Sequence, residues 1–231
     1  MTGVGRVAPA KLASPDFNHT HAHLWADILL DSSACCSESS DVMSEIKHLT
    51  LEQLESGLEH IRQSPKDVGV LKLISRRPNT DEREVVDKAQ LDPAHGLVGD
   101  NWKARGSRSA ADGMANPEMQ LNVMNARVIK LIAQDKSRWS LAGDQLFVDF
   151  DLSEANVPPG TRLTIGSAVI EVTAPPHLGC KKFSDRFGPD AMKFVNSPEG
   201  KQLHLRGVNA QVMQAGIIRN EDLVAKIRSQ E

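Results

Sequence analysis

The sequence is poor in cysteine and in long apolar runs, and both shortages restrict what the chain can be. No apolar stretch reaches the length of about 18 residues that a membrane-spanning helix needs. No basic start is followed by an apolar segment, so a secretory leader is not expected. Two of the three cysteines, Cys35 and Cys36, are adjacent and would bridge only under strain. We therefore expect a cytoplasmic chain with reduced thiols and no disulfide framework.

Several common motifs are also missing. The sequence has no C-x-x-C pair, no set of four Cys and His residues at zinc-site spacing, no glycine-rich nucleotide loop and no internal repeat of fixed period. The formal net charge of −3 gives no overall attraction to nucleic acids or membranes. A length of 231 residues, 40% of them hydrophobic, suits one domain with an extension or two small domains. The partners expected are small molecules or proteins.

The first 43 residues predict a flexible arm, because they are small, polar and without a clear period. His19, His21 and His23 alternate within this arm, which leaves a metal site open as an alternative to a plain histidine-containing tail. Residues 44–66 predict one amphipathic helix that ends at Pro65. Its indicators are a Thr50–Gln53 capping box and an apolar stripe of Leu51, Leu54, Leu58 and Ile61.

From residue 67 to 227 the pattern is β-rich. Strands are predicted at residues 68–75, 84–91, 145–151, 161–165, 168–173 and 207–214, with residues 161–173 forming a hairpin through Gly166 and Ser167. Helices are fewer: one is capped by Asn125 and another begins at Pro189. Many short strands with few helices favour an α+β domain built on a β-barrel.

Cys180 is the strongest candidate for chemistry. It follows the strand that ends near Thr173, after two prolines that cannot donate to a ladder, so we expect it on a loop. Six Lys or Arg and three acidic residues lie between positions 177 and 206. Cations favour the thiolate, which is both a nucleophile and a soft metal ligand, and they also suit a phosphate. The alternative is an unreactive cysteine beside lysines.

Four groups of motifs then resemble those of the MOSC family, the domain at the C-terminus of molybdenum cofactor sulfurases. The resemblance implies a β-barrel with a few peripheral helices and a cleft for the molybdenum cofactor or a sulfur species. The motifs lie at residues 96–100 (GLVGD), 120–125 (QLNVMN), 141–152 with 159–173 (LAGDQLFVDFDL, PGTRLTIG and VIEVT), and 179–183 with 206–222 (GCKKF, RGVNAQV and GIIRNED).

The resemblance also implies site residues. Cys180 matches the family's single cysteine, its proposed metal ligand or persulfide carrier. Cofactor-binding candidates by location are Lys181, Lys182, Arg206, Gly207 and Asn209. Three positions depart from the family pattern: Gly179 stands where proline is frequent, Asn101 where a histidine is frequent, and Glu221 where glycine is usual.

Three functions remain open at this stage. The chain is a molybdenum-dependent oxidoreductase module that reduces N-hydroxylated compounds with an electron-transfer partner, or a persulfide carrier between a sulfur donor and an acceptor protein, or a non-catalytic binding module. The family is associated with pyridoxal phosphate binding as well. No pyridoxal-binding lysine domain precedes the module in this sequence, so we do not expect it to generate sulfur from cysteine.

Other polar and aromatic residues have less specific interpretations. His177 and His204 are expected as solvated loop histidines, with ligand orientation or tuning of the thiol as the alternative. Asp100 is expected to serve a turn after Gly99. Arg206 suits a structural salt bridge as well as an anion contact. The tryptophans are expected to pack in the core; they are Trp25, Trp102 and Trp139.

Overall fold

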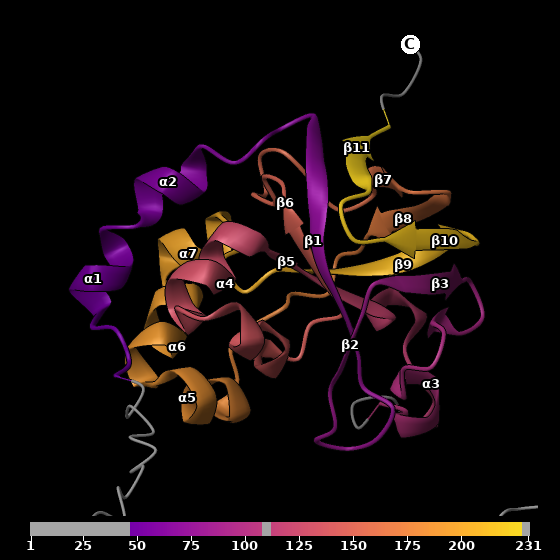
Figure 1. The fold of residues 1–231 in the computed structure, drawn as a ribbon, viewed down its shortest axis with the longest axis horizontal. Coiled ribbons are helices and arrows are strands. Elements are labelled where there is room, and N and C mark those ends of the chain that lie inside the picture. Colours follow the sequence, from indigo (N-terminus) through magenta and orange to yellow (C-terminus); the bar gives the residue numbers. More distant parts are fainter. Residues whose placement is uncertain (1–46, 108–111, 228–231) are drawn as a thin grey trace, which may run out of the picture. The chain divides into compact units, whose positions relative to one another are not determined.

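The computed structural model describes residues 47–107 and 112–227 (Figure 1). The predicted arm over residues 1–43, with its three histidines, Cys35, Cys36 and Trp25, lies outside the described residues. Within those residues, no helix is long and apolar enough to cross a membrane. Most of the described chain belongs to the family-like part, from residue 67 onward.

Seven of the described strands close into a β-barrel, which confirms the predicted fold class. Their order is β11-β7-β8-β9-β5-β6-β1, and β11 pairs with β1 to complete the circle. Every neighbouring pair is antiparallel except β5–β6, which is parallel. The strands are β1 Val68–Arg76, β5 Leu121–Asn125, β6 Leu146–Asp149, β7 Arg162–Ile165, β8 Ala168–Val172, β9 Val208–Gln214 and β11 Leu223–Lys226.

One predicted strand is split in two. Residues 84–91 form β2 Glu84–Val86, which pairs with the end of β1, and β3 Lys88–Asp92, which pairs with β10 Gly216–Arg219 in a separate three-stranded sheet. β4 Gly96–Leu97 completes that sheet. The single-strand prediction was wrong because the alternation continues through Asp87 while the pairing partner changes there, from the neighbouring β1 to β10, which lies far away in sequence.

The alternation in β6 places side chains as predicted. Leu146, Val148 and Phe150 point into the barrel core, whereas Phe147 points outward into a second hydrophobic cluster beneath the helices. The β7–β8 hairpin through Gly166 and Ser167 is also confirmed. A period of two is enough to predict such elements, since successive side chains of a strand leave opposite faces.

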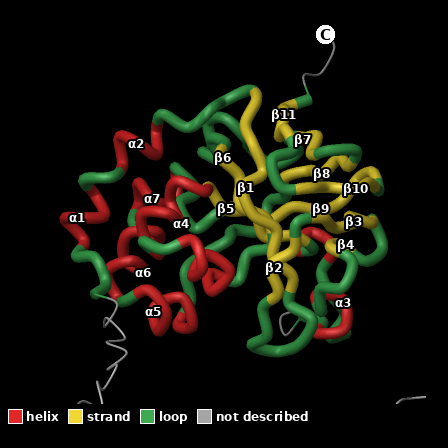
Figure 2. The backbone as a smooth tube through the Cα atoms, viewed as in Figure 1, coloured by secondary structure: helices red, strands yellow, loops and turns green. Residues whose placement is uncertain are grey.

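The helices gather mostly on one side of the barrel, around the outward-facing side chains of β6 (Figures 1 and 2). Asn125 caps α4 as predicted, its Oδ1 accepting from the Arg127 amide at 2.8 Å, and Pro189 begins α6. The helices are α1 Leu51–Glu55, α2 Leu58–Arg62, α3 Trp102–Arg105, α4 Ala126–Ala133, α5 Lys181–Phe187, α6 Pro189–Asn196 and α7 Pro198–Gln202, with 3-10 turns η1 Pro117–Met119 and η2 Lys136–Ala142.

The predicted single helix over residues 44–66 is two short helices in the described part. The Thr50–Gln53 capping box is present, and Leu54 and Ile61 are buried in the cluster beneath the helices. The helix breaks at Gly57, where a Cβ would run into the side chain of Leu131 on α4. Glycine at this position allows close approach to α4, a contact that the apolar stripe alone did not predict.

Candidate functional site

Cys180 lies at the end of the loop that follows β8, as the sequence predicted, directly before the helix α5. It is the N-cap of α5, and its carbonyl accepts hydrogen bonds from the amides of Phe183 and Ser184 at 2.9 and 3.0 Å. The preceding Gly179 is held from both sides by Asn196, whose Oδ1 accepts from the Gly179 amide and whose Nδ2 donates to its carbonyl. The thiol itself is exposed. The backbone thus fixes an accessible sulfur.

The thiol stands on a cavity of about 540 Å³ that is rich in cations. Its walls come from the β1–β2 connection, α3 and the residues after it, the end of η2, and the first turns of α5. Side chains with a positive charge dominate its lining; they are Arg77, Arg83, Arg105, Lys182, Arg186 and Arg206. Asp81 is the acidic residue among the lining residues that the structure describes.

Arg77 is held in place by a fully buried carboxylate. Asp100 accepts from Arg77 Nε at 2.8 Å and from Nη2 at 2.9 Å, and also from the Arg77 and Trp102 amides at 2.9 Å. Arg77 Nη1 donates to the Gly143 carbonyl at 3.0 Å. Asp100 was expected to serve a turn, and the structure gives it the further role of fixing an arginine at the cavity wall.

Two other arginines of the cavity lack a carboxylate partner of this kind among the described residues. Neither Arg83 nor Arg105 forms an ion pair with a carboxylate among the described residues. Burial lowers the pKa of Arg83, and nearby Arg186 and Arg77 lower it further; burial and then Arg77 lower the pKa of Arg105. Arg83 Nε is buried without a hydrogen-bond partner. An anion in this cavity would relieve both the mutual repulsion and the unpaired donor.

Behind the cavity lies a buried group of three ionisable side chains, which we call the Asp144 cluster: Asp144, His177 and Arg206. Arg206 Nη1 donates to Asp144 Oδ2 at 2.6 Å, and Nη2 donates to the Ala142 carbonyl at 2.9 Å. His177 Nδ1 lies 3.5 Å from Asp144 Oδ1. Burial raises the pKa of Asp144 against the lowering effect of Arg206. Burial, with Arg206 and Arg77, holds the pKa of His177 well below its ordinary value.

A second cavity, of about 380 Å³, lies beside the first and shares His177 and Arg206 with it. The segment from Pro175 to Leu178 contributes to its lining, which is largely apolar. Its apolar residues are Pro159, Val172, Ala174, Pro175, Pro176, Leu178, Val195 and Val208. The chain before Cys180 therefore separates an apolar cavity from a cationic one.

A family comparison matches this geometry. The MOSC domain model matches residues 94–225, which include Cys180, the Asp144 cluster and all or most of six of the seven barrel strands. The chain belongs to the MOSC domain family. The matched span covers more than half of the 231 residues, so the sequence resemblance is confirmed.

A solved structure supports the MOSC fold as well. YuaD of Bacillus subtilis is 13% identical with a TM-score of 0.53, over 71% of this chain and 97% of that one. Two further structures have lower TM-scores. YiiM of Escherichia coli is 16% identical with a TM-score of 0.45, over 70% and 71% of the two chains, and YiiM of Geobacillus stearothermophilus is 14% identical with a TM-score of 0.43, over 71% and 75%. None of the curated proteins matches.

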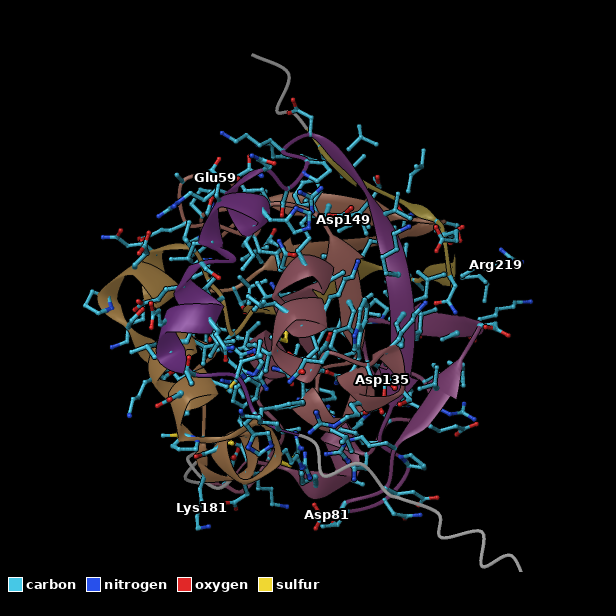
Figure 3. All side chains as sticks on the ribbon, turned by 60° about the vertical axis from the view of Figure 1, so that its left-hand side comes forward. Glu59, Asp81, Asp135, Asp149, Lys181 and Arg219 are labelled. Atoms are coloured by element: carbon cyan, nitrogen blue, oxygen red, sulfur yellow. The ribbon has the colours of Figure 1, made fainter. Side chains whose placement is uncertain are left out.

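The residues predicted to bind a cofactor divide among three locations in this MOSC domain. Lys182 and Arg206 line the cavity with Cys180, and Lys182 Nζ pairs with Asp81 at 2.7 Å. Lys181 is absent from the cavity lining: its side chain is 87% exposed, projects from the surface (Figure 3) and pairs with Asp185 on the same helix. Gly207 and Asn209 line the second cavity.

Gly207 and Asn209 have evident structural roles. Gly207 has a φ of +101°, and a Cβ there would collide with the Val123 backbone, so the tight entry into β9 needs glycine. Asn209 is buried, donates to the Pro175 carbonyl at 2.9 Å and accepts from Asn122 Nδ2 at 2.7 Å. It therefore ties the chain before Cys180 to the barrel.

The two histidines are less exposed to solvent than expected. His177 is largely enclosed, with 13% of its side chain exposed, so its interpretation as a solvated loop residue was wrong. His204 Nδ1 lies 2.6 Å from the Leu152 carbonyl and lines the second cavity. Trp102 and Trp139 are buried as predicted, and Trp102 also lines the Cys180 cavity.

Sequence reasoning missed three of the arginines that line the cavity, Arg77, Arg83 and Arg105. Arg77 follows the predicted strand over residues 68–75 and was not singled out, and neither were Arg83 and Arg105. The Arg76–Arg77–Pro78 run was the available indication, because charged residues at a strand end lie at a barrel rim. Among the described residues, no three His, Cys, Asp or Glu side chains gather as a metal site. A metal at Cys180 would need further ligands from a cofactor.

Proposed function

We propose that this MOSC domain binds the molybdenum cofactor in the Cys180 cavity and reduces N-hydroxylated compounds. The observation that supports this most is an accessible thiol at the rim of a cavity lined by six cations. A thiolate is a soft ligand for such a metal, and the cations suit the phosphate of the cofactor. When bound, the cofactor would supply the metal and the electron transfer.

The residues present fit this group in size and in chemistry. A cavity of about 540 Å³ is within the usual range for cofactor sites, and Arg83 Nε is a buried donor without a partner. Cys180 would hold the metal. Lys182, Arg186 and Arg206, with Arg83 and Arg105 opposite, would hold the phosphate. An electron-transfer protein and a cytoplasmic location belong to the same proposal.

The test is cofactor loading. The wild type and the Cys180→Ala variant are expressed in a host that makes the cofactor, and molybdenum and pterin are measured per chain. We expect both in the wild type and a loss of most molybdenum in Cys180→Ala. Lys181→Ala, at an exposed site outside the cavity, is the matched control and should load normally. Equal loading of wild type and Cys180→Ala would overturn the assignment of Cys180.

Exposure of the thiol also favours a second function, as a persulfide carrier. The Cys180 thiolate would attack the outer sulfur of a donor persulfide, forming an S–S bond and releasing the donor thiolate. Mass spectrometry after incubation with a desulfurase and cysteine would then show one added sulfur on Cys180. If no sulfur is added and Cys180→Ser keeps all ligand binding, the chain is a non-catalytic binding module.

A further inference from the structure

The Asp144 cluster holds three buried polar atoms that have no hydrogen-bond partner. They are Asp144 Oδ1, His177 Nδ1 and Arg206 Nε. Two of them, Asp144 Oδ1 and His177 Nδ1, face each other at 3.5 Å, and unsatisfied groups of this kind are rare in folded proteins. The cluster also borders the Cys180 cavity, since His177 and Arg206 belong to its lining.

The surroundings favour one position for the proton of His177. A carboxylate oxygen can only accept, so the ring nitrogen beside Asp144 Oδ1 is the donor. The Nδ1···Oδ1 distance of 3.5 Å is longer than a hydrogen bond, but the two atoms face each other. Arg206 donates to the other oxygen of Asp144 at 2.6 Å, which supports the carboxylate form. A neutral ring with Nδ1–H then carries its lone pair on Nε2.

The surroundings of His177 explain why its ring is neutral. Arg206 and Arg77 are the cations that act on it, Asp144 is the carboxylate in contact, and the ring is mostly removed from water. A second proton would add a charge beside two arginines. His177 is thus a neutral acceptor within a cavity whose other ionisable lining residues, apart from Asp81 and Cys180, are cationic donors.

We propose that His177 Nε2 accepts a hydrogen bond from the hydroxyl group of the N-hydroxylated substrate in the Cys180 cavity, and that Asp144 positions His177 for this. The inference rests on the proposed function and adds a substrate requirement to it. The substrate must carry a free N–OH, because an N–O-alkyl group has no proton to donate. The amine or amide product has lost that oxygen and therefore that contact.

The first test is the tautomer of His177 in the full-length protein as purified. Long-range proton–nitrogen NMR distinguishes the two tautomers of each histidine, and His177→Gln identifies the signal. We expect Nδ1 protonated and Nε2 bare in the wild type, and a mixture of tautomers in Asp144→Asn. Protonation at Nε2 in the wild type would overturn the proposal, even if Asp144→Asn fails to fold.

The second test compares two ligands that differ in one proton donor. Benzohydroxamic acid has a free N–OH, and its O-methyl ether does not. Titration of the wild type should move the His177 Nε2 resonance with benzohydroxamic acid, and the ether should bind roughly three- to tenfold more weakly, the value of one hydrogen bond. Equal affinity of the two ligands, with no shift at Nε2, would overturn the proposal.

A pair of substitutions separates positioning from plain packing. In His177→Gln the amide can reach the place of Nε2, whereas in His177→Asn it reaches only the place of Nδ1. In the molybdenum-loaded protein we expect KM for the N-hydroxylated substrate to rise roughly three- to tenfold in His177→Asn and much less in His177→Gln. Equal increases in both variants would contradict a specific contact. If the wild type binds no molybdenum, the proposed function fails, while the NMR results decide the role of His177.

Discussion

The two cavities that share His177 and Arg206 differ in charge although one short segment borders both. The cavity with Cys180 gathers six cations, whereas the second is lined mainly by prolines and aliphatic residues, with Lys201 and the shared Arg206 as its cations. Arg77, Arg83 and Arg105 reach the first cavity from distant parts of the chain, the β1–β2 connection and α3. Charge is therefore assembled on one side of the segment by the fold, around the one described cysteine.

The largest expected effect comes from substituting Arg206, which lines both cavities. Arg206→Met would leave Asp144 buried and unpaired, so we expect a loss of about 3–5 kcal/mol in the free energy of unfolding. Urea denaturation measures this. Arg162→Met, which removes an ion pair at the surface, is the matched control and should cost at most about 1 kcal/mol. The double variant Asp144→Leu with Arg206→Met should recover much of the loss. A stable Arg206→Met single variant would show that the fold does not depend on the Arg206–Asp144 ion pair.

The next prediction tests whether the cations of the Cys180 cavity bind an anion. Arg83→Ala removes a buried donor without an ionic partner, so we expect inorganic phosphate to bind about tenfold or more weakly, the value of a charge-assisted hydrogen bond. Calorimetry at low salt measures the affinity. Lys181→Ala, outside the cavity, should leave it unchanged. Equal losses in the two variants would show that phosphate responds to net charge rather than to the cavity.

A smaller effect is the contribution of His177 to the pH dependence of the free energy of unfolding. The unfolded histidine has a pKa of about 6.5, and the folded pKa is well below it. Below pH 6.5 the unfolded state therefore binds a proton that the native state does not, and stability falls as the pH falls. The loss continues, at about 1.4 kcal/mol per pH unit, until the folded pKa is reached. Denaturation from about pH 7.5 to about pH 5.5 should show this slope in the wild type and not in His177→Gln. Identical slopes would disprove the depressed pKa.

The smallest effect concerns the apolar cavity. Leu178 is 44% exposed, so Leu178→Ser should change the free energy of unfolding by at most about 0.5 kcal/mol. Phosphate affinity should also stay the same, because Leu178 lines the second cavity and not the first. Thermal denaturation and calorimetry check the two statements. A clear loss of phosphate binding would show that the two cavities act as one site.

Local patterns predicted the elements whose causes are local. The alternation of Leu146, Phe147 and Val148 predicted both faces of β6, and the Gly166–Ser167 pair predicted a hairpin. Asn125 and Thr50 predicted caps for the same reason, since a cap contacts residues two or three positions ahead. The change of partner at Asp87 depends on β10 and the close approach at Gly57 on Leu131, both far along the chain, and no periodicity includes them.

The candidate site divides in the same way. Cys180, Lys182 and Arg206 could be proposed from their order in the sequence and from the family motifs, and they do line one cavity. Gly207 and Asn209 were proposed on the same grounds but line only the second cavity, which Arg206 also lines. Sequence order does not predict on which side of a barrel wall a side chain lies.

By itself, the sequence determined the β-barrel class and the family and made Cys180 the candidate site, because alternation, turn residues and motif order are properties of neighbouring positions. The tertiary structure decided what surrounds that cysteine. It brought Arg77, Arg83 and Arg105 into one cavity with the thiol, and it buried His177 against Asp144. These contacts join residues from separate elements of the closed barrel, and their energies depend on burial, which arises only when the chain has folded.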